Sequence, residues 1–364
     1  MKWQYAQIVS ERNSWGAAVE FNARLCDGSP VRALAYVPQV GRPQPGDTVL
    51  VTSATHDRAL GTGGFVMIVA NPERLPDFEP GPGHIVKARY TPMQYMVLGV
   101  DEQESAHHDL LREADSIYGM PVVAADLHSA LPAIVAGIHV ARPEAKIAYI
   151  MTDGGALPAW FSQTAHRLRE DGHILGTITA AGQAYGGELE AVNNHTALLA
   201  ARLVWDADIA VITQGPGNLG TDTRWGFSGT ALGEALNAVH VLGGVPIAAL
   251  RASEADPRER HLGISHHSLT VLTRVVHAPC TVVVPMLSGL APAIQSTITA
   301  QLAMLSAEHL TLVRHPADHL AQALATPPAP LSTMGRRYEE DSLSFLAAAG
   351  RRRIRWADSL TLHS

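Results

Sequence analysis

From about residue 119 the sequence alternates short apolar runs with segments of helical length, and this alternation limits the possible folds more than any other feature. The apolar runs are PVVAAD, KIAYIMT, HILGTIT, DIAVIT, VPIAALR and CTVVVP. The helical segments between them are 129–140, 158–171, 189–205, 230–242 and 267–276. This alternation is typical of a parallel sheet with helices on both faces, and strands buried on both sides require continuous apolar runs. The sequence therefore predicts a doubly wound, mostly parallel α/β domain over residues 119–325.

The first 90 residues have a different pattern, with little helical periodicity. They contain five strand-like runs separated by turn residues: YAQIVSE, GAAVEFN, VRALAYVPQ, DTVLVTSA and GFVMIVAN. Short strands at this spacing predict a small antiparallel β-barrel domain over residues 1–90. We expect residues 91–118 to connect the two domains, and residues 326–364 to form a Pro-rich hinge and a C-terminal tail.

Charge argues against nucleic acid as a partner. The net charge is −7, whereas binding to the phosphate backbone needs clustered Lys and Arg. The basic cluster near the C-terminus is interpreted as a solvated helix face or tail. It consists of Arg351, Arg352, Arg353 and Arg355, preceded by Arg336 and Arg337.

Cysteine usage and hydropathy favour a cytoplasmic protein with no membrane partner. Cys26 and Cys280 are too few for a disulfide framework or a four-cysteine metal site. The sequence has no apolar run of roughly 18 residues, and its N-terminus lacks the apolar middle of a signal peptide. The apolar helical segments around 230–242 and 290–305 either seal a homo-oligomer or complete the core.

Five polar, Gly-containing loops follow successive strands of the predicted sheet. They are ADLHS, TDGGALP, AGQAYGGELEAVNNH, TQGPGNLGTDTRWGFSG and RASEADPRERHLGISHH. In an open parallel sheet, ligands bind beyond the carboxyl ends of the strands, where helix N-termini and loop amides gather. We therefore expect the loops to share one site for a small, anionic metabolite.

The proton-transfer candidates in these loops are Asp126, His128, Asp153 and one of His266 and His267. Asp126 and His128 alternate, so at a strand end they share a face, where the carboxylate would orient the imidazole. The alternative for His128 is a cap on the following helix. The ligand-binding candidates are Gly154, Gly155, Gly186, Gly187, Gln214, Gly215, Gly217, Asn218, Gly220, Thr221 and Arg258.

The segment SHH at 265–267 reads as a helix start with Ser265 as the N-cap. Successive helical residues point about 100° apart, so His266 and His267 do not easily ligate one metal together. One of them is expected to face the site. A metal held by His128, Asp153 and one of the pair is an alternative, but this spacing matches no known ligand motif, and we predict no metal site.

The glycines at 215, 217 and 220 satisfy the G-x-G-x-x-G pattern of dinucleotide-binding loops. In those proteins a helix begins within the motif and the next strand ends in an acidic residue. Here the helix is expected only at Thr230, and the next strand ends at Arg251. We therefore interpret the loop as an amide nest for an anion, with Thr221, Asp222 and Thr223 as further polar groups, and leave the cofactor unassigned. No G-x-S-x-G motif supports a serine hydrolase.

Four motifs, GHIVKARYTPMQ, YIMTDGGALP, GPGNLGTDT and GISHH, together resemble a bacterial family of conserved hypothetical proteins defined as a domain of unknown function. The resemblance covers residues 1 to about 350 and implies no particular activity. A fainter similarity, carried by the barrel and the Tyr90-Thr91-Pro92 segment, is to the proprotein subunit of glycine and proline reductases. That family makes a pyruvoyl group at an internal cysteine, and this chain has no cysteine between Cys26 and Cys280.

Two classes of function fit these observations. The first is an enzyme that acts on a small anionic metabolite. The second is a non-catalytic ligand sensor, or a subunit of a larger complex in which the barrel docks a partner. A catalyst should bring a histidine within hydrogen-bonding distance of a carboxylate at an open pocket, whereas a sensor needs binding groups and an element that moves.

Overall fold

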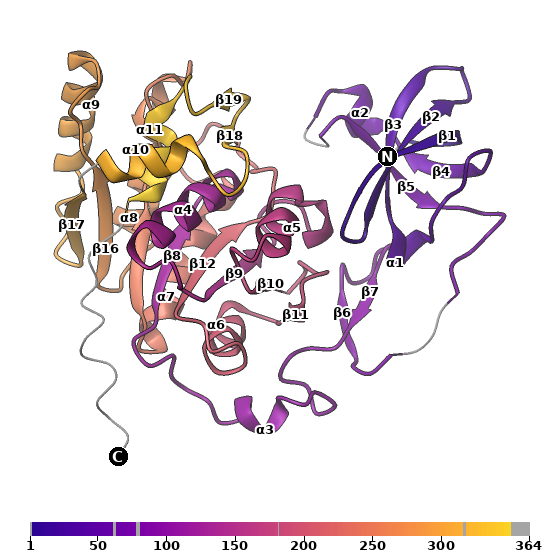
Figure 1. Cartoon of the computed structure of the whole chain (residues 1–364), viewed down its shortest axis with the longest axis horizontal. Helices are drawn as coiled ribbons and strands as arrows, with labels where there is room; N and C mark the ends of the chain where they lie inside the picture. Colours follow the sequence, from indigo (N-terminus) through magenta and orange to yellow (C-terminus); the bar gives the residue numbers. More distant parts are fainter. Residues whose placement is uncertain (1, 61–62, 78–80, 181, 316–317, 351–364) are drawn as a thin grey trace. The chain divides into compact units, whose positions relative to one another are not determined.

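A computed structural model describes residues 2–60, 63–77, 81–180, 182–315 and 318–350 (Figure 1). The chain divides into two compact units. The first comprises Met1–Leu98 and Trp160–His166, and the second comprises Gly99–Ala159 and Arg167–Ser364. The basic cluster at 351–355 lies outside the described residues.

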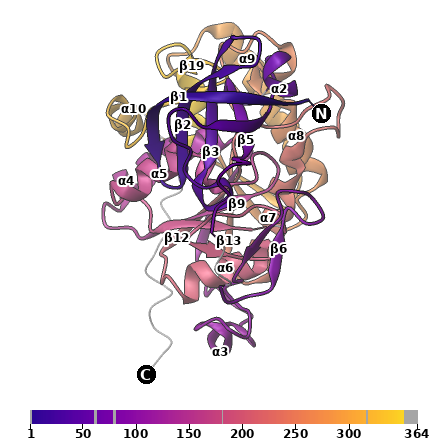
Figure 2. The same cartoon turned by 90° about the vertical axis from the view of Figure 1, so that its right-hand side faces the viewer.

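The first unit contains a closed five-stranded barrel, which confirms the predicted N-terminal barrel (Figure 2). Its strand order is β1-β2-β3-β5-β4, and every pairing is antiparallel except that of β3 with β5. Alternate residues such as Phe21, Ala33 and Val51 fill the interior. The strands are β1 (Trp3–Trp15), β2 (Ala18–Leu25), β3 (Pro30–Tyr36), β4 (Thr48–Thr52) and β5 (Phe65–Ala70).

Three further elements complete this unit: the short helices α1 (Val37–Val40) and α2 (Ala54–Asp57), and a hairpin of β6 (Ile85–Lys87) with β7 (Tyr95–Val97). The segment Trp160–His166 also belongs to it. There the Trp15 indole donates to the Trp160 carbonyl at 2.8 Å. The predicted helix over 158–171 is therefore wrong in its first turns. A 3-10 turn (Ala159–Phe161) comes first, and α5 runs only over Gln163–Glu170.

The second unit is built on an eight-stranded, all-parallel sheet, which confirms the predicted α/β architecture. The central strands are buried along their whole length, which explains the continuous apolar runs. The strand order is β11-β10-β9-β12-β8-β13-β16-β17. The strands are β8 (Pro121–Ala125), β9 (Ile147–Thr152), β10 (Gly176–Thr179), β11 (Leu189–Glu190), β12 (Ile209–Gln214), β13 (Val245–Ala249), β16 (Cys280–Pro285) and β17 (Leu310–His315).

Two groups of helices cover this sheet. The first group is α4 (Leu131–Ala141), α10 (Asp318–Ala325) and α11 (Ser342–Ala349), which pack together (Figure 1). The second is α6 (Asn194–Leu203), α7 (Ala231–Val241) and α8 (His266–Arg274), with the short α3 (His108–Leu111) against α6. Helix α11 of the first group and helix α7 of the second group both contact β13. Helix α9 (Pro292–Ala303) packs on the short β15.

The helix α11 docks tightly on α4, because a glycine lets the two backbones approach. A Cβ on Gly137 would lie 2.2 Å from the Ala349 carbonyl oxygen. Leu343 and Phe345 of α11 are fully buried. Among the described residues, no helix has the length and apolarity needed to cross a membrane.

The direction of chain progress reverses at the centre of the sheet. From β8 the chain moves outward through β9, β10 and β11, returns to β12 between β9 and β8, and then continues through β13 on the other side. Ligand crevices in open α/β sheets form at such reversals, outside the carboxyl ends of the strands. A ligand site is therefore expected at the carboxyl ends of the adjacent strands β12, β8 and β13.

Candidate functional site

A buried carboxylate lies at the carboxyl edge of these three strands. Asp126 directly follows β8, and its side chain is 2% exposed. One oxygen, Oδ1, accepts hydrogen bonds from Gln214 Nε2 at 3.1 Å and Asn218 Nδ2 at 3.2 Å. The other, Oδ2, accepts from Arg251 Nη1 at 2.9 Å. Strand ends at β8, β12 and β13 thus deliver one acid, two amides and one guanidinium to a single point.

The imidazole of His267 completes this cluster. Its Nδ1 lies 3.2 Å from Asp126 Oδ2 and 3.0 Å from Arg251 Nη1. The carboxylate only accepts and the guanidinium only donates, so Nδ1 is engaged in either tautomer. The ring stacks on Phe227, with the centroids 3.8 Å apart and the planes 6° from parallel. Both contacts fix the ring, and they leave Nε2 as the nitrogen that can act on a ligand.

The electrostatics of the cluster favour an ionised Asp126. Burial by itself raises the pKa of this carboxyl, but the hydrogen bond from His267 and the charge of Arg251 outweigh burial and lower the pKa. The carboxylate also requires a glycine beside it, because a Cβ on Gly229 would lie 2.0 Å from Oδ1.

The expected pairing of Asp126 with His128 is wrong. The chain turns into a 3-10 helix at His128 (His128–Ala130), so the alternation of a strand no longer holds there. The His128 Nδ1 instead lies 2.9 Å from the Tyr149 hydroxyl, which in turn lies 2.9 Å from Thr213 Oγ1. Burial lowers the pKa of His128 to about 4 and raises the pKa of Tyr149. His128 belongs to a buried polar chain with Tyr149 and Thr213.

Three glycine candidates let two loops pack closely. A Cβ on Gly154 would lie 2.2 Å from Gln214 Oε1, and one on Gly155 would lie 2.1 Å from the Gly215 carbonyl oxygen. A Cβ on Gly215 would lie 2.4 Å from the Ala156 carbonyl oxygen. The half-buried Asp153 begins this loop after β9. Close packing therefore accounts for Gly154, Gly155 and Gly215, and it places Gln214 beside Asp126.

Two other glycines lie at the sheet edge. The Gly186 N–H donates to Glu190 Oε1 at 2.6 Å, and a Cβ on Gly187 would lie 2.6 Å from the Thr177 carbonyl oxygen. These contacts are made around β11, which three strands separate from β8. The structure does not bring Gly186 and Gly187 to the Asp126 cluster.

The outer part of the Gly-rich loop is open. Gly217 has a φ of +96°, and open space surrounds Gly217 and Gly220 at the Cβ position. Thr221 is exposed and lies 3.2 Å from the Thr223 hydroxyl. The helix that follows begins after a 3-10 turn (Ser228–Thr230), close to the predicted start at Thr230.

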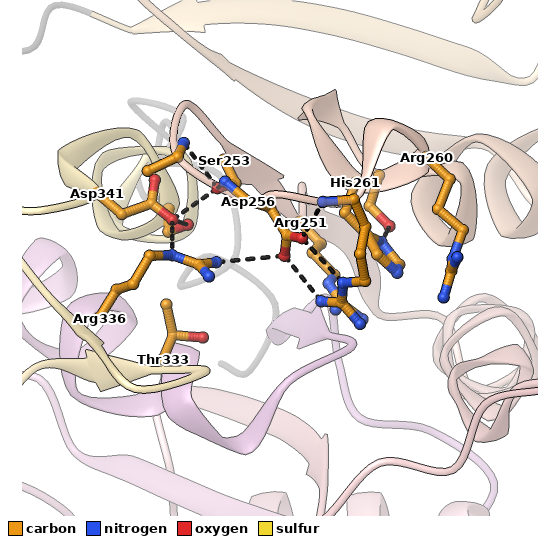
Figure 3. A network of polar contacts seen from close by, with 12 residues as sticks. Arg251, Ser253, Asp256, Arg260, His261, Thr333, Arg336 and Asp341 are labelled. Atoms are coloured by element: carbon orange, nitrogen blue, oxygen red, sulfur yellow. Dashed lines mark hydrogen bonds and ion pairs between the residues drawn. The ribbon is translucent and has the colours of Figure 1, made fainter. Parts of the chain in front are cut away.

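The arginine candidate Arg258 is committed to a second network, part of which Figure 3 shows. Arg258 binds both oxygens of Asp256, at 2.9 and 2.8 Å. Arg336 donates to Asp256 at 3.2 Å and to the fully buried Asp341 at 3.0 Å. Ser253 donates to Asp341 at 2.6 Å. This network ties the hairpin of β18 (Ser332–Thr333) and β19 (Arg336–Arg337), and the start of α11, to β14 (Ala252–Ser253).

A small cavity lies between the two networks. Asp126, Arg251, Asp256, His261 and Arg336 are among the residues that line it. It leaves about 30 Å³ of room for a water-sized molecule, which is enough for a water or an ion.

Three histidines converge beside Asp126, and the sequence reasoning missed this cluster. His261, His266 and His267 each offer a ring atom, and these atoms lie within 4.8 Å of one another. The predicted N-cap is present, since Ser265 accepts from the His267 amide. The rings of His266 and His267 lie side by side, with their centroids 4.4 Å apart.

His261 reaches the pair through an irregular connection. A 3-10 turn (Glu259–His261) and the short β15 (Gly263–Ile264) lie between Arg258 and α8. The His261 Nδ1 lies 2.8 Å from Ser265 Oγ. Burial, then the charges of Arg251 and Arg258, lower the pKa of His261 to about 3. Burial, then the nearby His267 and Arg260, lower the pKa of His266 to about 4.

Fold and site together define an α/β protein with a buried charged cluster and three histidines at the carboxyl edge of a parallel sheet. The chain belongs to the family described as "Protein of unknown function (DUF3866)", whose model matches residues 32–351. This confirms the predicted membership in a family defined as a domain of unknown function. A search of curated proteins finds no match.

Proposed function

We propose that the second unit is an enzyme that binds a small anionic metabolite at the carboxyl edge of its sheet and transfers a proton to or from it. His267 is the acid–base group, and Asp126 is its positioning partner. The observation that carries the proposal is the contact of Asp126 Oδ2 with His267 Nδ1 at 3.2 Å, inside a buried cluster drawn from separate strand ends.

Burying these charged side chains costs desolvation free energy, and this supports a role for the cluster beyond folding. Arg251 and Asp126 form an ion pair whose side chains are 10% and 2% exposed. Apolar residues of similar volume often stabilise a fold as well as a buried ion pair does, so such a pair is weak evidence for stability. Perturbed pKa values that cluster in one cavity are instead typical of functional sites.

An unsatisfied polar atom beside His267 supports a ligand. His266 Nε2 is buried and has no hydrogen-bond partner among the described residues. Buried polar atoms are otherwise almost always paired, so an unpaired atom calls for a bound group. Arg260 and Arg251 lie close enough to lower the pKa of His266, and a guanidinium already paired with one carboxylate still has N–H groups that can bind an anion.

The proton transfer follows from the fixed ring. With the Nδ1 proton donated to Asp126, the His267 Nε2 holds a lone pair that accepts a proton from the substrate. The Asp126 carboxylate then stabilises the imidazolium that forms. The same Nε2–H returns the proton to the product.

The proposal is tested by thermal denaturation of the full chain against a panel of small carboxylates and phosphates. We expect at least one anion to raise the melting temperature of the wild type but not of the His267→Gln variant. His240→Gln, which changes an exposed histidine on α7, is the control and should respond as the wild type does. The binding proposal fails if no anion stabilises the wild type, or if His267→Gln responds equally.

Turnover is tested separately on the anion that binds. The sample is incubated with the wild type in deuterated water and analysed by mass spectrometry for exchange or conversion. Proton transfer predicts a mass change that the His267→Gln variant does not produce. A ligand that binds and is returned unchanged would assign the protein instead to the ligand sensors.

A further inference from the structure

We propose that His261, His266 and His267 form a binding site for a divalent first-row transition metal, with Zn²⁺ as the natural ion. Their ligand-capable atoms lie within 4.8 Å of one another. A tetrahedral ion with Zn–N bonds of about 2.0–2.1 Å needs ligand atoms about 3.3 Å apart. Small rotations of the three rings would bring the ligand atoms from within 4.8 Å of one another to the spacing of about 3.3 Å that the ion needs.

The hydrogen bonds around the triad leave the right nitrogens for a metal. His261 uses Nδ1 toward Ser265, and His267 uses Nδ1 toward Asp126. Each therefore keeps Nε2 for a ligand. Metal-binding histidines almost always bond their second nitrogen to a carboxylate, carbonyl or water, so Asp126 occupies the place of such an orienting group for His267.

His266 supplies an independent observation. Its Nε2 is buried and has no hydrogen-bond partner among the residues that the structure describes. The ring lies against both other histidines, with centroids 5.2 Å from that of His261 and 4.4 Å from that of His267. A metal would satisfy this nitrogen, which otherwise bears the cost of burial without a bond.

The charges nearby permit a cation. Asp126 pairs with Arg251, and Asp256 pairs with Arg258, so acids balance these two arginines. Three neutral imidazoles suit zinc, nickel, copper and iron, whereas magnesium and calcium prefer oxygen ligands. Three protein ligands leave a fourth position for water, as in catalytic zinc sites.

This inference deepens the proposed function and rests on the same site. A metal on Nε2 would make His267 a ligand, and the hydroxide formed from a metal-bound water would then take over from His267 as the proton acceptor. Asp126 keeps its positioning role. A metal beside Arg260 would also strengthen the preference for an anionic substrate.

The experiment titrates the metal-free full chain with Co²⁺, which reports its coordination by visible absorption, and then displaces it with Zn²⁺. We expect one equivalent of Co²⁺ with the intense absorption of a four- or five-coordinate nitrogen site. His266→Gln should weaken binding at least tenfold, and Asp126→Asn, which alters an orienting group, by about 10- to 100-fold. His240→Gln should bind as the wild type does.

A wild type that binds no Co²⁺, or that shows only the weak absorption of an octahedral surface ion, would overturn the proposal. So would a folded His266→Gln variant with unchanged stoichiometry and affinity. The wild-type spectrum decides the matter even if a variant fails to fold. Anion-dependent stabilisation of metal-free protein distinguishes the two proposals, because it would preserve the proposed function while the metal site fails.

Discussion

Replacing Asp126 by Asn removes the charge of the central carboxylate while nearly preserving its shape. The change leaves the Arg251 guanidinium, 10% exposed, without its buried counter-ion at 2.9 Å. In either orientation, the N–H₂ group of the new Asn side chain would face another donor, which is either Arg251 or the amides of Gln214 and Asn218. Removing one partner of a buried ion pair typically costs about 3–5 kcal/mol. We expect the free energy of unfolding of the second unit to fall by that amount.

The double variant Asp126→Asn/Arg251→Met tests whether the pair is the cause. Because the second substitution removes the uncompensated charge, the two losses should not add, and the coupling should be about 2 kcal/mol or more. Asp206→Asn is the surface control. Its carboxylate is 71% exposed, and it pairs with Arg202 and Lys146, so its loss should cost less than about 1 kcal/mol.

The assay is a urea titration read by hydrogen exchange in peptides that cover β8 and β12, which reports on the second unit by itself. The reasoning is refuted if Asp126→Asn costs no more than the surface control does. It is also refuted if the two single losses add in the double variant.

Other parts of the structure give three further predictions. Lowering the pH from about 6.5 to about 4 should cost the wild type about 3 kcal/mol more than it costs His128→Phe, since burial lowers the pKa of His128 from 6.5 to about 4 and the unfolded chain gains that proton first; acid urea titrations of both proteins measure the difference. Gly229→Ala should cost about 1–3 kcal/mol, because its Cβ would meet a carboxylate oxygen at 2.0 Å, whereas Gly220→Ala, in open space, should change the urea midpoint little. A thiol reagent should label exposed Cys26 in the native protein but not Cys280, whose pKa burial raises to about 12; equal labelling by mass spectrometry would contradict this placement.

Much of the fold was predictable because a strand that is buried on both faces needs a continuous run of apolar residues. The continuous apolar run of β12 (Ile209–Gln214) exists because both of its faces are covered, and the sequence pattern detects this directly. The order of the strands within the sheet has no comparable signature in the sequence. Nothing in the run indicates that β12 lies between β9 and β8, and this position is what brings Gln214 to Asp126.

The site was predictable only in outline. Loops at the carboxyl edge of the sheet drew attention to Asp126 and His267, which the structure brings into contact. The sequence indicates only that Arg251 stands where a dinucleotide site would have an acidic residue, whereas in the structure it is the ion-pair partner of Asp126, 125 residues away in sequence. His261 was missed because a 3-10 turn and a two-residue strand, and no helical or strand period, place it beside His266.

The central claim is that Asp126 holds the His267 ring so that Nε2 is available to a ligand. Long-range ¹H–¹⁵N spectra of the full chain, labelled at histidine, test this claim most directly, because they report which ring nitrogen carries the proton. The account predicts a proton on His267 Nδ1 and a lone pair on Nε2, with this pattern lost in Asp126→Asn. A proton on Nε2 in the wild type, or a spectrum that Asp126→Asn leaves unchanged, would contradict it.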